Sequence, residues 1–156
     1  MSERYQAIPR TLCLVTHDGK ILLIEYGERK GAMRGYYNAL GGHIEAGEGV
    51  IESAKREIRE ESGLEAGNTR LCGVVHVSNF FGKNVMMFVT RSEVSSTETT
   101  ESEEGRLHWV PIEKLNCFNL FGDVKAIVEK ALRDNSVFTA KDEFDGEGIL
   151  IRMEFE

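Results

Sequence analysis

The sequence predicts one α/β domain, residues 1–156, in which helices pack against a mixed β-sheet as an α/β sandwich. Three observations favour this class. The chain of 156 residues is long enough for one core and short for two. Strand-sized apolar runs come in pairs joined by turn residues, and two amphipathic helical patterns separate these pairs. Internal repeats and low-complexity linkers are absent from the sequence.

The first expected elements form a hairpin. Residues 8–16 and 20–26 are rich in leucine, isoleucine and valine, and the Asp18-Gly19 turn between them is a strong hairpin signal. A polar, glycine-rich loop is expected over 27–35, and a glycine-punctuated segment leads from Asn38 toward the first helix.

A helix is expected over 50–62, followed by a pair of strands. The apolar stripe of this helix comprises Val50, Ile51, Ala54 and Ile58. Gly63 stands where a helix ends most easily, because glycine accepts a positive φ. Residues 71–81 and 85–91 then read as strands around a Gly-Lys-Asn turn.

The second half of the chain begins with a Ser/Thr/Glu-rich surface loop over 92–104. A strand over 106–110 and a short helical turn over 111–115 are expected next. Apolar residues at helical spacing predict a helix over 123–133, and the tail, 137–155, reads as a second hairpin.

Composition and charge narrow the class of function. The net charge of −7 opposes binding to a nucleic-acid polymer, which usually requires a basic face. No apolar run approaches the roughly 20 residues of a membrane span, and no secretory signal is visible, so a cytoplasmic protein is expected. The three cysteines lack the spacing of a zinc site or a disulfide framework.

The predicted helix over 50–62 carries the clearest chemical signal. Glu57, Glu60 and Glu61 stand at i, i+3 and i+4, so their carboxylates share one helix face and repel one another. A hard divalent cation such as Mg²⁺ would relieve this repulsion and could bridge the carboxylates to substrate phosphates. The alternative is a solvated helix face without a function.

The segment around these glutamates resembles the Nudix box, Gly-x5-Glu-x7-Arg-Glu-U-x-Glu-Glu-x-Gly-U, in which U is a bulky aliphatic residue. Every specified position is matched, by Gly42, Glu48, Arg56, Glu57, Ile58, Glu60, Glu61, Gly63 and Leu64. The resemblance implies a Nudix-type α/β/α sandwich and a diphosphohydrolase that uses Mg²⁺, with Mn²⁺ as the alternative ion.

The resemblance also implies roles for particular residues. Glu57 and Glu61 correspond to metal ligands, Glu60 to a ligand or the catalytic base, and the carbonyl of Gly41 to a further ligand. Arg56 would brace the carboxylates, with an exposed i,i+4 ion pair as the alternative.

An acidic residue outside the box often joins the metal site in MutT-type members of the family. The segment Glu101-Ser102-Glu103-Glu104 resembles that region, and Glu104 is the expected ligand, with Glu103 as the second choice and an ordinary acidic loop as the alternative.

Substrate-binding residues follow from a comparison with oxidised-purine nucleoside triphosphatases of the family. Asn38 matches their base-recognising asparagine, and Phe121 and Asp123 fall near an aromatic residue and the first of two recognition aspartates. The second aspartate is replaced by Val124, a departure from the pattern. Arg34, together with Arg29 and Lys30 of the same loop 27–35, is a candidate for neutralising phosphate charge, and a solvated loop is the alternative.

The resemblance implies hydrolysis of a nucleoside triphosphate, ordinary or oxidised, to the monophosphate and pyrophosphate by a monomer or homodimer. The alternatives within the family are hydrolysis of ADP-ribose or a dinucleoside polyphosphate, and a catalytically silent nucleotide sensor. A Nudix-fold isomerase of isopentenyl diphosphate would need a catalytic cysteine in a suitable motif, which none of the cysteines provides.

Overall fold

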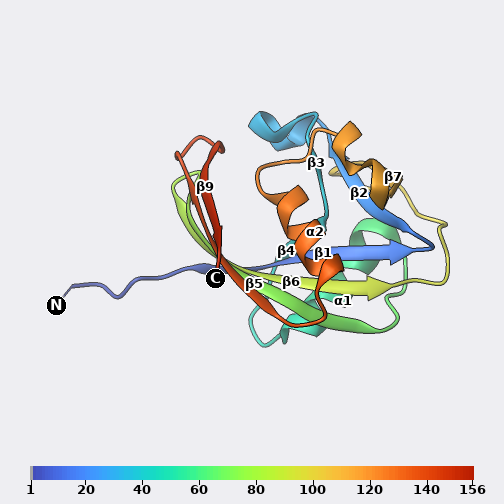
Figure 1. Ribbon diagram of the computed structural model, residues 1–156, viewed down its shortest axis with the longest axis horizontal. Coiled ribbons are helices and arrows are strands. Elements are labelled where there is room, and N and C mark those ends of the chain that lie inside the picture. Colours follow the sequence, from blue (N-terminus) through green and yellow to red (C-terminus); the bar gives the residue numbers. More distant parts are fainter. Residues whose placement is uncertain (1) are drawn as a thin grey trace.

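A computed structural model describes residues 2–156 as a strongly curled mixed sheet with one α-helix on each face (Figure 1). The strands are β1 (Ile8–His17), β2 (Lys20–Tyr26), β3 (Tyr37–Asn38), β4 (Leu40–His43), β5 (Thr69–Phe80), β6 (Lys83–Glu93), β7 (Gly105–Pro111), β8 (Phe138–Phe144) and β9 (Leu150–Phe155). The helices are α1 (Val50–Ser62) and α2 (Val124–Arg133), and two 3₁₀ turns are η1 (Glu28–Met33) and η2 (Ile112–Cys117).

The sheet has the order β3-β2-β1-β6-β5-β8-β9, with β4 also paired to β1 and β7 to β2. The β1–β6 and β5–β8 pairs are parallel and the other pairs are antiparallel, which makes the sheet mixed. The expected α/β sandwich with a mixed sheet is therefore confirmed.

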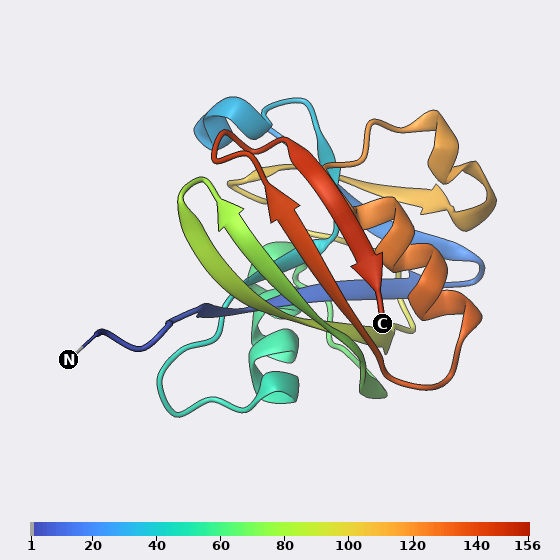
Figure 2. The ribbon, with the colours of Figure 1, turned by 60° about the vertical axis from the view of Figure 1, so that its left-hand side comes forward.

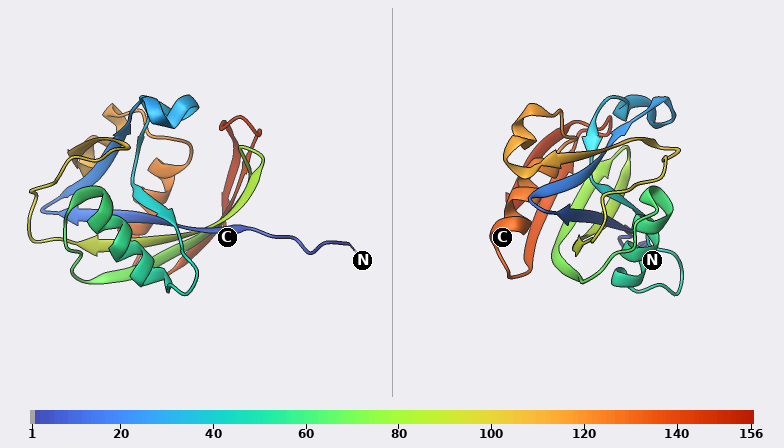
Figure 3. Two further views of the ribbon diagram at one scale, coloured as in Figure 1. Left: turned by 180° about the vertical axis from the view of Figure 1, so that it is seen from behind. Right: turned by 90° about the vertical axis from the view of Figure 1, so that its right-hand side faces the viewer.

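Strand β1 lies at the centre of the core and is buried on both faces. Because side chains alternate along a strand, Leu12 and Leu14 point into the cluster that includes α2, whereas Cys13 and Val15 point into the cluster that includes α1. The two helices thus cover opposite faces of the same strand, as the view from behind shows (Figure 3).

Two strands, β2 and β4, pair with different parts of the same edge of β1, and the sheet forks between them. Strand β2 pairs with β1 at Thr16 and His17, next to the hairpin turn, while β4 pairs with its first half, from Arg10 to Cys13. Strands β2 and β4 therefore diverge. The curled ends of β5, β6, β8 and β9 rise opposite this fork (Figure 2).

Most predicted elements are present within two residues of their expected bounds. The helix over 50–62 and both hairpins lie where the sequence predicts them. Two segments differ. The loop expected over 27–35 contains the 3₁₀ turn η1, and the glycine-punctuated segment contains the short strands β3 and β4. Glycine is unfavourable in strands, so the composition of Leu40–His43 did not predict the strand β4.

Candidate active site

The carboxylates of α1 differ sharply in exposure. Glu57 and Glu61 are buried, with 9% and 8% of their surface exposed. The apolar residues Ala54 and Ile58 of the same helix are buried too. The side chain of Glu60 is 59% exposed. A merely solvated helix face is thus wrong for Glu57 and Glu61, because such burial of carboxylates is rare unless they have partners.

Arg56 connects these carboxylates to the loop that precedes α1. Its guanidinium donates two hydrogen bonds to Glu48, at 2.8 and 2.9 Å, and others to Glu57 Oε1 at 2.9 Å and Glu60 Oε2 at 3.1 Å. It also donates to the carbonyl of His43 at 3.0 Å. The i,i+4 pair with Glu60 is therefore one part of a larger network, and the fork on Glu48 fixes the guanidinium next to Glu57.

The paired glycines of β4 allow the strand to pack directly against these carboxylates. A Cβ on Gly42 would lie 2.4 Å from Glu57 Oε1, and a Cβ on Gly41 would lie 2.1 Å from the carbonyl oxygen of Thr11 on β1. The N–H of Gly41 donates a hydrogen bond to Glu61 Oε2 at 3.2 Å. Strand β4 thus lies between β1 and the acidic face of α1 with no space for side chains at these positions.

The charges at this site repel one another. Burial raises the pKa of Glu57, and burial followed by repulsion from Glu104 raises the pKa of Glu61 to about 8. A divalent cation that prefers oxygen ligands fits this donor set, because it would favour the ionised form of each carboxyl group. Within residues 2–156, no three acidic, histidine or cysteine side chains converge on one point.

Glu104 lies just before β7, and its contacts differ from those of Glu103. Lys30 of η1 is 3.3 Å from Glu104 Oε1, and the charge of Glu104 acts on both Glu57 and Glu61. Glu103 pairs instead with Arg29 at 3.4 Å, and both of those side chains are largely exposed. Of the two candidates, only Glu104 therefore raises the pKa values of Glu57 and Glu61 by its charge.

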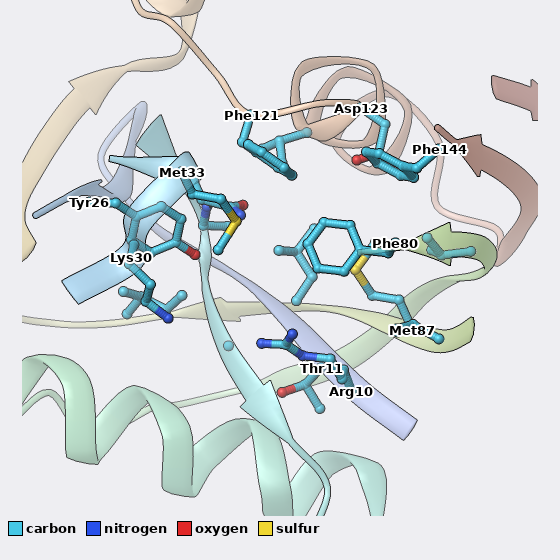
Figure 4. A pocket seen from close by; sticks show the side chains of 18 residues that line it. Arg10, Thr11, Tyr26, Lys30, Met33, Phe80, Met87, Phe121, Asp123 and Phe144 are labelled. Atoms are coloured by element: carbon cyan, nitrogen blue, oxygen red, sulfur yellow. The ribbon is translucent and has the colours of Figure 1, made fainter. Parts of the chain in front are cut away.

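A cavity of about 750 Å³, its open mouth included, lies beside the fork in the sheet (Figure 4). Apolar and aromatic side chains supply most of its wall. Two cations, Arg10 and Lys30, also line it. The larger apolar lining residues are Tyr26, Met33, Phe80, Met87, Phe121 and Phe144. An apolar cavity with a few polar groups is typical of a small-molecule site.

The predicted substrate-binding residues divide in two groups. Asn38, Phe121 and Asp123 line the cavity, as does the predicted metal ligand Gly41. Arg34 is absent from the lining; its side chain is 65% exposed and pairs with Glu28 at 3.4 Å. Lys30, four residues earlier, occupies the wall instead because η1 turns it inward, over the ring of Tyr26.

Sequence reasoning missed several lining residues. Arg10 precedes a buried run on β1, and Phe80, Met87 and Phe144 belong to three different strands. Their proximity depends on the curl of the sheet, which local patterns do not reveal. Asp142 on β8 was also missed. It lies beside Asp123, and a carboxyl at an inward position of an alternating strand was the available signal.

The cysteines take no part in the cavity. Cys13 and Cys72 are buried, and burial raises the pKa of Cys13 to about 12; Cys117 is exposed. None of the three is among the lining residues, which disfavours cysteine-dependent isomerase chemistry there. Within residues 2–156, no helix is both long and apolar enough to cross a membrane.

Comparisons with known proteins agree with this geometry. The NUDIX domain model matches residues 7–131. An oxidized purine nucleoside triphosphate hydrolase of Danio rerio is 31% identical over 115 residues, covering 72% of each chain, and one of Mus musculus is 34% identical over 117 residues, again covering 72% of each. A crystal structure of a mutator MutT protein from Bacillus halodurans superimposes with a TM-score of 0.84 at 25% identity, covering 96% of this chain and 97% of that one.

The fold, the acidic face of α1 and these matches define the class of protein. The chain belongs to the Nudix family, and it is a MutT-like Nudix diphosphohydrolase. Members of this family generally use divalent metals.

Proposed function

We propose that this Nudix hydrolase converts a nucleoside triphosphate, ordinary or oxidised, to the monophosphate and pyrophosphate. The observation that carries the proposal is the position of Gly41, which both donates to Glu61 and lines the aromatic cavity. The carboxylate cluster and the cavity are therefore contiguous. One ligand could place a flat base among the aromatic side chains and its phosphates near the carboxylates.

The proposed cation is Mg²⁺, with Mn²⁺ as the alternative. It would be held by the carboxylates of Glu57, Glu61 and Glu104 and by the carbonyl of Gly41. Such an ion, when bound, supplies neutralisation of phosphate charge and a lower pKa for a coordinated water. Because Mg²⁺ usually retains several waters, a few carboxylates suffice.

The chain's own residues would orient the reaction. Arg56 holds Glu57 in place through its hydrogen bond of 2.9 Å. Glu60 is exposed enough to accept a proton from water, or to serve as a further ligand. Arg10 and Lys30 line the cavity and would contact the phosphates, whereas Arg34 is not among the lining residues.

The relatives support a purine nucleotide as substrate. Those from Danio rerio and Mus musculus are named for the hydrolysis of oxidised purine nucleoside triphosphates. Asn38 and Asp123 offer amide and carboxyl groups to a base edge in the same cavity. Nucleoside triphosphates are intracellular metabolites, so the proposal includes a cytoplasmic location.

We further propose that residues 1–156 act as one domain. Phe144 lies beyond residues 7–131, the range matched by the family model, yet it lines the same cavity as Phe121.

The test is turnover of a substrate panel by purified protein with Mg²⁺. The panel comprises ordinary and 8-oxo nucleoside triphosphates, ADP-ribose and diadenosine polyphosphates, with pyrophosphate and phosphate measured separately. We expect pyrophosphate from a nucleoside triphosphate, and a kcat lower by about 100-fold or more in Glu57→Gln and Glu61→Gln, since each removes a charged metal ligand.

Glu65→Gln is the matched control, because it removes a carboxylate from an exposed ion pair with Arg59 just beyond α1. Its kcat should match that of the wild type. Faster cleavage of ADP-ribose or a dinucleotide would contradict the substrate. A kcat within a few-fold of wild type in both Glu57→Gln and Glu61→Gln would contradict the site.

A further inference from the structure

Strand β9 is the last strand of the sheet, and one of its edges is free. Strand β8 covers one edge, and within residues 2–156 no strand pairs with the other (Figure 2). The unpaired N–H and C=O groups along such an edge can pair with a further strand. Ile151, the extra residue of a bulge, has no partner on β8 and is 60% exposed. The free edge of β9 is therefore a candidate interaction surface.

Alternate residues of β9 direct their backbone groups toward this free edge. The N–H of Glu156, just beyond β9, donates a hydrogen bond to the carbonyl of Thr139 on β8 at 3.0 Å. Backbone groups along a strand point alternately to its two sides, so those of the other even-numbered residues near the end of β9 also face β8. The N–H and C=O groups of Met153 and Phe155 therefore face the free edge.

The outer face of the sheet carries charges of both signs beside this edge. On β9, Arg152 and Glu154 are exposed, and they lie opposite Glu143 and Lys141 of β8, which are exposed as well. Lys141 and Glu154 form an ion pair at 3.5 Å. An edge strand with charges of one sign would repel a second copy of itself. Strand β9 instead carries one charge of each sign, two residues apart.

This arrangement selects one register for the pairing of two β9 strands. Two copies of a chain usually associate about a two-fold axis, which makes adjacent edge strands antiparallel. The backbone groups that face the free edge meet their counterparts when the axis passes beside Arg152, Met153 or Glu154. The first register places two arginines opposite each other, and the third places two glutamates. Only the axis at Met153 places each Arg152 opposite Glu154 of the second copy.

In the register centred on Met153, both faces of the joined sheet are complementary. On the outer face the charges alternate across four strands, from Glu143 through Arg152 to Glu154 and Lys141 of the second copy. On the inner face Ile151 lies next to Phe155 of the second copy. Opposite charges and apolar side chains in directly opposite positions both stabilise paired strands.

The net charge of each chain acts against association, but it does not decide the outcome. Two chains that each carry −7 repel one another. At physiological salt, however, exposed charges farther apart than about 8 Å are largely screened. The charges that oppose each other directly across the two β9 strands are much closer than this, so their signs determine whether the edges pair.

We propose that two copies of this chain pair through the free edges of β9, antiparallel about a two-fold axis at Met153, to form a homodimer with one continuous sheet. The contact goes beyond the proposed function and is independent of the substrate. A contact between two short strands is small, and small interfaces are typical of weak complexes. The dimer should therefore form reversibly, as the protein concentration rises through the micromolar range.

Sedimentation equilibrium at physiological salt tests the dimer and its register. We expect the Kd of the dimer to rise about tenfold or more in Arg152→Glu and in Glu154→Arg, because each change places like charges opposite each other at two symmetry-related positions. An equimolar mixture of these two variants should form a heterodimer with a Kd near that of the wild type, since every opposed pair is again of opposite sign.

Two further variants separate this contact from other effects of charge. Lys114→Glu changes the net charge by the same amount as Arg152→Glu, at an exposed position on η2 beside β7, and should leave the Kd unchanged. The double variant Arg152→Glu with Glu154→Arg loses the attraction to Glu143 and Lys141 within its own chain but restores the attraction between copies. It should therefore dimerise more tightly than either variant with one change.

Hydrogen exchange provides a measurement on the wild type alone. The amides of Met153 and Phe155 should exchange more slowly as protein concentration rises, because the dimer protects the groups that face the free edge. A wild type that remains monomeric at every concentration would overturn the inference. So would a dimer that persists in both charge reversals, a mixture of them that stays monomeric, or a dimer that leaves the exchange of these two amides unchanged.

Discussion

Two glycines determine how closely β4 can approach the acidic helix. At Gly41 the constraint is backbone against backbone, because a Cβ would lie 2.1 Å from the Thr11 carbonyl oxygen. At Gly42 the space is filled by the carboxylate of Glu57. These two contacts explain why β4 contains paired glycines, because larger residues would separate this strand from the carboxylates of α1.

Gly41→Ala should weaken both fold and activity. Strand β4 must move away from Thr11 to accommodate the methyl group, so we expect a loss of about 1–3 kcal/mol in the free energy of unfolding, as in other overpacked sites. Urea denaturation would measure this loss. Gly27→Ala is the control, since the atom nearest to its Cβ would be 3.8 Å away. Equal stability of the two variants would show that β4 adjusts freely.

At the scale of elements, the loop between β6 and β7 is attached to the end of α1. Thr100 donates its N–H to the carbonyl of Ser62 at 2.9 Å, and its side chain packs against Gly63, which ends the helix with a φ of 75°. Trp109 on β7 holds the same loop through a hydrogen bond to Thr97. Glu104 follows in this loop, so its position is coupled to the end of the helix.

Gly63→Ala should therefore act in two separable ways. A left-handed φ costs a non-glycine residue about 1–2 kcal/mol, and the new Cβ would lie 2.8 Å from Thr100 Cγ2. Thr100→Ala removes that methyl group but leaves the φ. We expect the double variant to be more stable than the sum of the single effects predicts, a coupling that denaturation of all four proteins would measure. Simple additivity would contradict the contact.

The elements also show what local sequence can and cannot reveal. The helix over 50–62 was predictable because one apolar stripe and Gly63 define it, and the hairpins because their turns are marked by Asp-Gly. Arg34 and Lys30 could not be separated, since the direction of each depends on the 3₁₀ turn η1. Asp123 and Asp142 come together only because α2 packs against β8, so their proximity could not be predicted from local sequence.

At the scale of the whole molecule, the divided edge of β1 brings two kinds of site together. Because β4 replaces β2 along the first half of β1, the acidic face of α1 and the aromatic cavity meet at Gly41. The far wall of the cavity comes from β5, β8 and the start of α2, which also supply the buried aspartates. Under the proposed function, the metal would be bound at the carboxylates of α1 and the base in the adjoining cavity.

The buried aspartate pair should make the stability of the whole molecule depend on pH. In the unfolded chain Asp142 ionises near its ordinary pKa of 3.8, but in the folded protein burial and Asp123 raise the pKa of Asp142 to about 9. The folded state therefore binds more protons between these values, so this contribution to stability is full below pH 4 and is lost as pH rises toward 9. One proton allows a slope of at most about 1.4 kcal/mol per pH unit.

Asp142→Asn removes the titrating group, so its stability relative to the wild type should increase from pH 5 to pH 9. Urea denaturation of both proteins in metal-free buffer at several pH values would measure this difference. Contributions of Glu57 and Glu61, whose pKa values are also raised by burial, are common to both proteins and cancel. Glu143→Gln, a change at the neighbouring, exposed position of β8, should give a stability curve parallel to that of the wild type. Parallel curves for Asp142→Asn as well would mean that Asp142 ionises in the folded protein near its ordinary pKa.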